Sequence, residues 1–247
     1  MIKKIKIFIL KLFIDNLYLL KKIIIAIDGP AASGKSTTAK LVAEALGYLH
    51  IDTGAMYRAI TLNVLQNRVT PTNPSRVAEI ATNCKVSLKK NDRAISVLLD
   101  GIDVTSSIRS QEVNSAVSAV SNNRKVREVL VREQRRMGLH GGVVLEGRDI
   151  GTVVFPNAQL KIFMTAHKIE RVKRRKKDLQ TIGFNVEDED LMEQLTRRDE
   201  LDSTRDISPL KKAEDAIELD TTELTIEEQV EFIVKHAKAI IAGQEIK

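Results

Sequence analysis

A glycine-rich segment at residues 29–37 (GPAASGKST) constrains the fold of this chain more than any other feature. It follows residues 22–28 (KIIIAID), a β-branched apolar run typical of a strand that is buried on both faces. It leads into residues 36–46, where apolar side chains recur at helical spacing, and Gly47 stands where a helix C-cap belongs. A complete G-x-x-x-x-G-K-S/T pattern between a predicted strand and a predicted helix indicates a phosphate-binding P-loop.

This loop has the groups that a nucleoside triphosphate requires. Its glycines let backbone N–H groups face the phosphates, and the N-terminus of the following helix adds a partial positive charge. We expect Lys35 to reach the β and γ phosphates and Ser36 to ligate Mg²⁺. The predicted binding residues for ATP are Gly29, Pro30, Ala31, Ala32, Ser33, Gly34, Lys35, Ser36 and Thr37.

A P-loop alone leaves GTPases, transporter ATPases, helicases and small-molecule kinases open. The sequence has no N-K-x-D guanine motif and no transporter signature, and its 247 residues leave little room for a motor domain. A small kinase remains as the favoured reading.

The rest of the chain predicts an α/β fold. Apolar runs at residues 142–145 and 159–164 are typical of further buried strands. Helices are expected over residues 110–137, 168–180 and 225–242, and strands that alternate with helices favour an open parallel sheet. Residues 84–105 have short strand-like runs separated by turn residues, which indicates a small antiparallel insert.

Composition narrows the partners. The formal net charge of +6 favours polyanions, but aromatic residues make up only 4% of the chain and there is no Trp, which disfavours a nucleic-acid surface. Cys84 is the only cysteine, so no internal disulfide is possible. The histidines are scattered rather than grouped at metal-ligand spacing, and we interpret them as ordinary core or surface residues: His50, His140, His167 and His236. A cytoplasmic location fits these features.

The first residues differ in composition from the rest. Lys11, Asp15 and Asn16 interrupt an apolar stretch that is too broken for a transmembrane span, and a signal-peptide cleavage site is missing. We interpret residues 1–19 as a non-core extension, or as a start upstream of the native one, without stable membrane association. The catalytic domain is expected to cover residues 20–247.

Three further motifs make the resemblance specific. Residues 52–58 (DTGAMYR), 146–156 (EGRDIGTVVFP) and 198–205 (RDELDSTR) follow the P-loop in the order and at the spacing of bacterial cytidylate kinases. From about residue 20 to the C-terminus, the chain resembles this family of P-loop kinases. The resemblance implies a parallel core sheet flanked by helices, a monophosphate-binding insert at about residues 80–118 and a lid at about residues 171–185. It also implies phosphoryl transfer from ATP to CMP and dCMP by a monomer.

The resemblance carries over site residues by position. The implied monophosphate site comprises Thr53, Tyr57, Arg58, Ser118, Arg127, Glu146, Arg148, Asp149, Arg198, Asp202 and Arg205. Arg174 is implied at the ATP site, and the implied catalytic residues are Lys35, Arg58, Arg148 and Arg205. Thr53 stands where many relatives have Ser, and Glu146 where some have Asp, and both differences conserve the functional group.

Elementary chemistry supports several of these roles. Arginine forks bind an acceptor phosphate bidentately, and Asp202 is suited to ribose hydroxyls. Cytosine needs an acidic or hydroxyl partner and a cationic one, which Glu146 or Asp149, Ser118 and Arg127 could supply. A phosphate monoester is already largely a dianion near pH 7, so no general base is required. The alternatives are a P-loop kinase for another monophosphate or for a metabolite hydroxyl, and a non-catalytic nucleotide-binding regulator.

Overall fold

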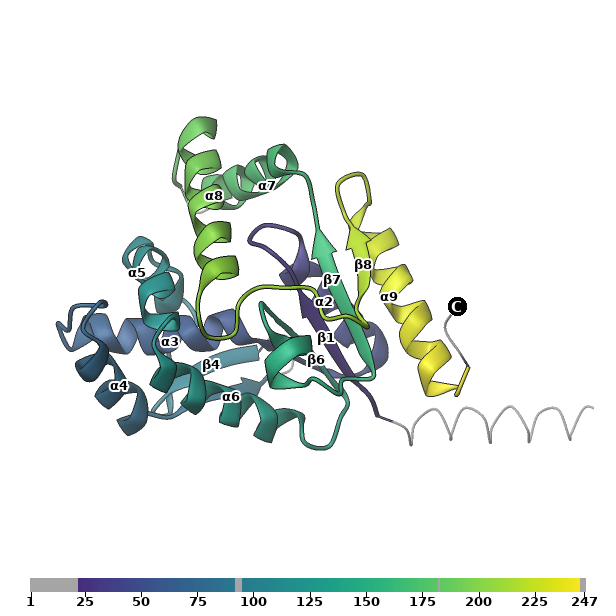
Figure 1. Ribbon diagram of the computed structural model, residues 1–247, viewed down its shortest axis with the longest axis horizontal. Coiled ribbons are helices and arrows are strands. Elements are labelled where there is room, and N and C mark those ends of the chain that lie inside the picture. Colours follow the sequence, from purple (N-terminus) through teal and green to yellow (C-terminus); the bar gives the residue numbers. More distant parts are fainter. Residues whose placement is uncertain (1–21, 92–94, 182, 245–247) are drawn as a thin grey trace, which may run out of the picture.

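A five-stranded parallel sheet forms the centre of the molecule (Figure 1). The computed structural model describes residues 22–91, 95–181 and 183–244, so the extension expected at residues 1–19 lies outside the described residues. The strands occur in the order β2-β6-β1-β7-β8. Their bounds are Ile24–Asp28 for β1, Leu49–Asp52 for β2, Val143–Gly147 for β6, Leu160–Thr165 for β7 and Ile217–Asp220 for β8. The predicted α/β class with a parallel core sheet is confirmed.

Helices cover both faces of this sheet. Ile25 and Ile27 of β1 pack with α2 (Lys35–Leu46) and α9 (Ile226–Ile241) in one apolar cluster. Ala26, between them in the sequence, belongs to the other cluster, which includes α3 (Thr53–Gln66) and α6 (Arg124–Gly138). Since side chains alternate across a strand, burial on both faces explains the unbroken apolar run of β1.

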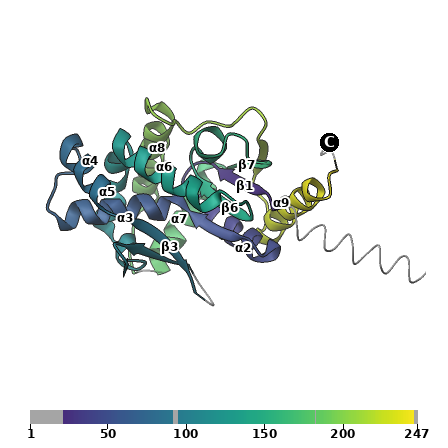
Figure 2. The same cartoon turned by 90° about the horizontal axis from the view of Figure 1, so that it is seen from below.

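A second, antiparallel sheet lies beside α3 (Figure 2). Its strands are β3 (Val86–Lys90), β4 (Ile95–Leu99) and β5 (Ile102–Asp103), and α4 (Pro74–Asn83) precedes it. The antiparallel element predicted at residues 84–105 is therefore confirmed. Val97 and Leu99 bury their side chains in the same cluster as α3, which attaches the small sheet to the core.

The structure has two helices where the sequence predicted one helix over residues 110–137, so the prediction of a single continuous helix was wrong. After a 3-10 turn (Ser107–Arg109), α5 (Gln111–Ser121) ends at Asn122 and α6 begins after Asn123. The Asn123 side chain accepts hydrogen bonds from the backbone N–H groups of Lys125 at 2.9 Å and Val126 at 3.4 Å. An asparagine N-cap starts a new helix and lets the chain change direction at this point.

Two helices stand above the C-terminal ends of β1 and β7 (Figure 1). These are α7 (Lys168–Thr181) and α8 (Asp188–Thr204). The helix predicted over residues 168–180 agrees with α7, whereas α8 was not predicted. Val172 of α7 and Leu191 and Leu195 of α8 form a small apolar cluster with Ala31 of the P-loop. The expected lid therefore begins on a helix whose base packs directly on the phosphate-binding loop. Within the described part of the chain, no helix is both long and apolar enough to cross a bilayer.

Candidate active site

The P-loop (residues 29–37) joins β1 to α2, as the sequence predicts. Gly29 has φ of 150°, and a Cβ added there would lie 2.1 Å from the carbonyl oxygen of Met164. Gly34, the residue before α2, has φ of 93°. Only glycine tolerates these conformations and this close approach without strain. The loop therefore brings Lys35 and Ser36 into the first turn of α2, where helical N–H groups lack intrahelical partners and can bind an anion.

The amine of Lys35 is buried against its own loop. It donates hydrogen bonds to the carbonyl oxygen of Pro30 and, at 3.1 Å, to Oγ of Ser33. Burial lowers the pKa of Lys35 well below its ordinary value, Arg148 lowers it further, and Glu146 acts in the opposite direction. Burial and a neighbouring cation both disfavour the charged amine, and an anion bound at this position would favour it.

Ser36 and Glu146 meet beside this amine. Oγ of Ser36 donates to a carboxylate oxygen of Glu146 at 2.6 Å, although 110 residues separate them in the chain. Glu146 lies at the end of β6, next to β1, and its side chain is buried. Of the two carboxylates that the sequence offered for the base pocket, Glu146 thus lies with the P-loop.

The Ser36 and Glu146 pair fits a magnesium ion bound together with a nucleotide. Among the described residues, no group of three or more His, Cys, Asp and Glu side chains is arranged to hold a metal ion. Mg²⁺ needs only one or two protein oxygens when phosphate oxygens and waters complete its coordination. A hydroxyl and a carboxylate at the N-terminus of α2 have the hard oxygen donors that this ion prefers.

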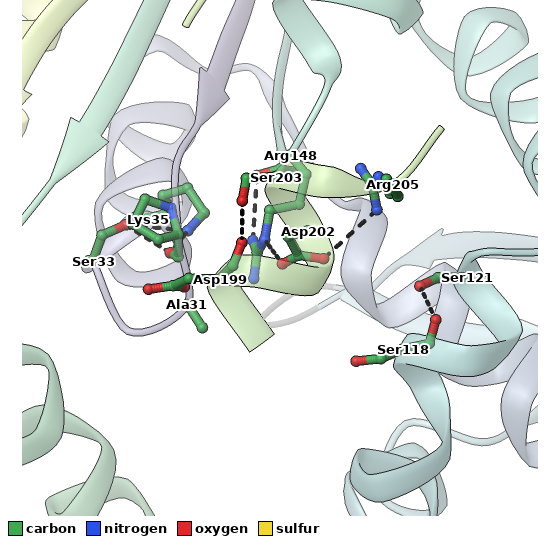
Figure 3. A network of polar contacts seen from close by, with 12 residues as sticks. Ala31, Ser33, Lys35, Ser118, Ser121, Arg148, Asp199, Asp202, Ser203 and Arg205 are labelled. Carbon is green, nitrogen blue, oxygen red and sulfur yellow. Dashed lines mark hydrogen bonds and ion pairs between the residues drawn. The ribbon is translucent and has the colours of Figure 1, made fainter. Parts of the chain in front are cut away.

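A cleft of about 840 Å³ opens between α5 and the α7–α8 pair. Its wall includes Ser118 from α5 and Arg198, Asp202 and Arg205 from the α8 region, which the sequence predicted as neighbours. Arg175 of α7 also lines it. Figure 3 shows Arg148 and Asp202 between Lys35 and Arg205, with Ser118 on the helix opposite. The P-loop and the cleft therefore adjoin through Arg148.

Positive charge gathers in and beside the cleft. Arg175, Arg198 and Arg205 line it, and Arg58 and Arg148 lie outside its wall but close enough to Arg198 to lower its pKa. We call Arg58, Arg148, Arg175, Arg198 and Arg205 the arginine cluster. The Asp202 carboxylate accepts from Nε of Arg148 at 2.8 Å and lies 3.6 Å from a terminal nitrogen of Arg205. Burial alone would raise the pKa of Asp202, but Arg148 and Arg198 hold it below its ordinary value.

Arg198 shows the electrostatic cost of this arrangement. Burial lowers its pKa to about 10, and the nearby Arg148 contributes in the same direction. Buried nitrogens without a hydrogen-bond partner in the described residues include Nε of Arg198, Nε of Arg58 and Nη2 of Arg205. Buried donors of this kind are normally satisfied. A bound phosphate would satisfy them and neutralise the cluster.

Three other predicted residues form a buried group below the cleft. Arg127 pairs with Asp149 at 2.5 Å, donates to the carbonyl oxygen of Ser121, and lies with its guanidinium 5.2 Å from the centre of the Tyr57 ring. Only 3% of Arg127 is exposed. The described cleft wall contains Ser118 but neither Arg127 nor Asp149. The structure thus places Arg127 with Asp149 and Tyr57 rather than in the cleft wall with Ser118.

Thr53 and Arg58 begin and orient α3. Asp52 caps this helix by accepting from the backbone N–H of Ala55 at 2.8 Å, and its other oxygen accepts from Arg58 at 3.2 Å. The Thr53 hydroxyl donates to the main-chain oxygen of Glu146 at 2.6 Å. The 52–58 motif therefore joins the end of β2 to the end of β6.

Arg174, predicted at the ATP site, lies next to the P-loop. One of its terminal nitrogens is 3.6 Å from the position that a Cβ on Gly34 would take. The guanidinium donates to the hydroxyl and the carbonyl oxygen of Thr221 and to Glu170. Its neighbour Arg175, rather than Arg174, lines the cleft.

Comparisons with known proteins identify the family of this chain. A family model described as cytidylate kinase matches residues 25–239. The chain is 50% identical over 215 residues to a cytidylate kinase of Bacillus subtilis (strain 168), covering 87% of this chain and 96% of that protein. The chain belongs to the cytidylate kinase family.

A second family member, a cytidylate kinase of Bacillus cereus (strain ATCC 10987 / NRS 248), is 49% identical over 222 residues, which cover 90% of this chain and 99% of that one. Among solved structures, a shikimate kinase from Bacteroides thetaiotaomicron matches with a TM-score of 0.45 at 12% identity, covering 90% of this chain and 99% of that one. Membership of the family makes the chain a phosphotransferase.

Sequence reasoning missed two residues that organise this family site. His50, interpreted as an ordinary residue, lies with its Nε2 3.0 Å from Glu146. Asp28, at the end of β1, accepts from the backbone N–H groups of Ile150 at 2.8 Å and Gly151 at 2.7 Å. These bonds fix the π-helical turn Ile150–Val154, which begins two residues after Arg148. For Asp28 the available signal was its position at the C-terminal end of the predicted strand 22–28. His50 lies in none of the predicted strands, so the sequence offered no such signal for it.

Proposed function

We propose that this chain transfers the γ-phosphoryl group of ATP to CMP and dCMP. The observation that carries the proposal is the arginine cluster, in which Arg58, Arg198 and Arg205 have buried nitrogens without partners among the described residues. Arg148 and Arg198 of this cluster act on the charge of Lys35 in the P-loop. Such donors suit an acceptor that carries a phosphate. The cytosine preference is supported by the family and by Ser118 in the cleft wall.

The proposed mechanism needs no general base. The acceptor phosphate is largely a dianion near pH 7, so it is already a nucleophile. The arginine cluster would hold it in line with the triphosphate on the P-loop, and positioning with charge stabilisation supplies the rate. The Lys35 amine would exchange the Pro30 carbonyl oxygen for phosphate oxygens. Mg²⁺, held with the nucleotide by Ser36 and Glu146, would neutralise phosphate charge.

We further propose that α7 and the turn after it act as a lid over residues 171–185. The position of the cleft between α5 and the α7–α8 pair supports this role, since movement of α7 would narrow it. Closure would bring Arg175 toward the nucleotides and would exclude water, which otherwise competes as the phosphoryl acceptor.

A kinase for a metabolite hydroxyl is the alternative, and it would need a base near the transferred group. A substrate panel separates the two. The full chain, with ATP and Mg²⁺, is assayed for ADP release against CMP, dCMP, UMP, AMP, GMP and shikimate. We expect the highest kcat/KM with CMP or dCMP. Equal rates with all the monophosphates, or activity with the hydroxyl acceptor alone, would reject the proposal.

A further inference from the structure

A buried hydrogen-bond chain links β2 to the P-loop through a single carboxylate. One oxygen of Glu146 accepts from Oγ of Ser36 at 2.6 Å, and the other lies 3.0 Å from Nε2 of His50. The side chain of Glu146 is 5% exposed and that of His50 is 15% exposed. Both carboxylate oxygens thus have a fixed partner in a site almost closed to solvent.

The direction of these bonds follows from the chemistry of the groups. A carboxylate only accepts hydrogen bonds, so both the serine hydroxyl and Nε2 of His50 donate to it. His50 belongs to β2, which pairs with β6 so that His50 stands opposite Val144 and Asp52 opposite Glu146. The imidazole is therefore a diagonal neighbour of Glu146 on a rigid parallel sheet, and it holds the carboxylate from the side away from Ser36.

Glu146 has competing cations nearby. Its charge acts on the buried amine of Lys35, and Arg148 is two residues along the chain. A glutamate side chain has several rotatable bonds, so without a second anchor its carboxylate can turn toward these cations. Substitution of a group that orients a metal ligand typically costs about 10- to 100-fold in metal affinity.

We propose that His50 is a positioning residue that fixes the Glu146 carboxylate against Ser36, so that this pair accepts a divalent cation together with the nucleotide phosphates. The inference rests on the proposed function, since it assumes a Mg²⁺-dependent nucleotide at the P-loop. It assigns His50 no contact with either substrate.

The test measures metal coupling rather than turnover. The Kd of ADP for the full chain is determined by titration calorimetry with and without Mg²⁺. The Kd without Mg²⁺ divided by the Kd with Mg²⁺ reports the contribution of the metal. His50→Leu should reduce this ratio about tenfold or more, since outer-shell substitutions typically have effects of this size. His50→Gln, which keeps a donor, should lie between His50→Leu and wild type. His140→Leu, which changes an exposed histidine, should behave as wild type.

A double-mutant cycle adds a second criterion. In a Glu146→Gln background, His50→Leu should have no further effect on the ratio, because its partner is already altered. Equal weakening of ADP binding with and without Mg²⁺, a ratio in His50→Leu within about twofold of wild type, or an undiminished effect in the Glu146→Gln background would overturn the inference. Lack of CMP phosphorylation by the wild-type chain would reject the proposed function instead.

Discussion

Asp202 accepts a hydrogen bond from Nε of Arg148 at 2.8 Å, and the same carboxylate faces Arg205 at 3.6 Å. The expected role of Asp202 was to bind ribose hydroxyls. Its two oxygens are turned toward arginines, so it also orients the groups that would hold the acceptor phosphate. This relationship joins β6 to α8 and makes the geometry of the arginine cluster depend on one buried carboxylate.

The first prediction concerns this carboxylate. Asp202→Asn should lower the free energy of unfolding by about 1.5 to 3 kcal/mol, because a hydrogen bond to a charged group is lost among like charges. The KM for CMP should rise, while the preference for cytosine over uracil should stay. Urea denaturation and KM values for CMP and UMP check this. A reversed base preference would instead place Asp202 in the base pocket.

Lys35→Met should abolish turnover without unfolding the protein. The amine is the group expected to neutralise the transferring phosphoryl group, and loss of such a contact typically costs about 100-fold or more in kcat. Lys35 is buried, and burial lowers the pKa of its amine. Replacement of this disfavoured buried charge by an apolar side chain should therefore cost little stability. Retention of more than about a tenth of wild-type kcat in a folded Lys35→Met protein would contradict the assigned role.

Arg198→Met should separate stability from function. Burial and, to a lesser extent, repulsion by Arg148 and Arg58 lower the pKa of Arg198 to about 10. Its replacement removes a buried charge and this repulsion, so it should stabilise the fold by about 1 to 3 kcal/mol. The KM for CMP should rise by about tenfold or more, because a charge-assisted phosphate contact is lost. The KM for ATP should hardly change. Thermal unfolding and steady-state kinetics are the measurements, and reduced stability together with an unchanged KM for CMP would contradict this prediction.

Arg127 illustrates how the structure changes an experiment. From the sequence, Arg127→Met was the natural test of cytosine recognition. Since Arg127 pairs with the buried Asp149, this substitution should destabilise the fold by about 3 to 5 kcal/mol, as expected when one partner of a buried pair is removed. Ser118→Ala is the better test, because Ser118 lines the cleft. A higher KM for CMP with an unchanged KM for ATP is expected.

The sequence predicts elements with strong local signals and misses those set by tertiary contacts. The P-loop and β1 follow from one motif and one apolar run. By contrast, α3 was hidden because the 52–58 motif was interpreted as chemistry, although Asp52 also caps the helix. The short strand β8 (Ile217–Asp220) is stabilised by pairing with β7 at the sheet edge, which no local pattern specifies.

In the candidate site too, local motifs could be predicted from the sequence and tertiary contacts could not. Motifs name the charged residues, but pairing depends on where the chain folds back. Sequence could not decide between Glu146 and Asp149 for the base pocket, because both follow the same strand. The register of β6 against β1 and β2 takes Glu146 to Ser36 and His50, and the turn after β6 takes Asp149 to Arg127.

The last prediction concerns Asp28, which holds the turn after Arg148. Burial raises its pKa from the ordinary 3.8 to about 6, and the hydrogen bonds from Gly151 and Ile150 offset only part of this effect. A raised carboxyl pKa favours the protonated form in the folded state. The stabilisation is therefore complete below about pH 4 and is lost as the pH rises through about 6.

The side chain introduced by Asp28→Asn does not titrate, so this variant should not lose stability from this position as the pH rises. Between pH 4.5 and 8, the free energy of unfolding of Asp28→Asn relative to that of wild type should increase by about 2 kcal/mol, at about 1.4 kcal/mol per pKa unit. Urea denaturation at several pH values measures the difference, and Glu193→Gln, which alters an exposed carboxylate on α8, is the control. A difference between Asp28→Asn and wild type that is independent of pH would mean that the two backbone N–H groups keep Asp28 ionised, and the turn would then be held by a charged carboxylate throughout.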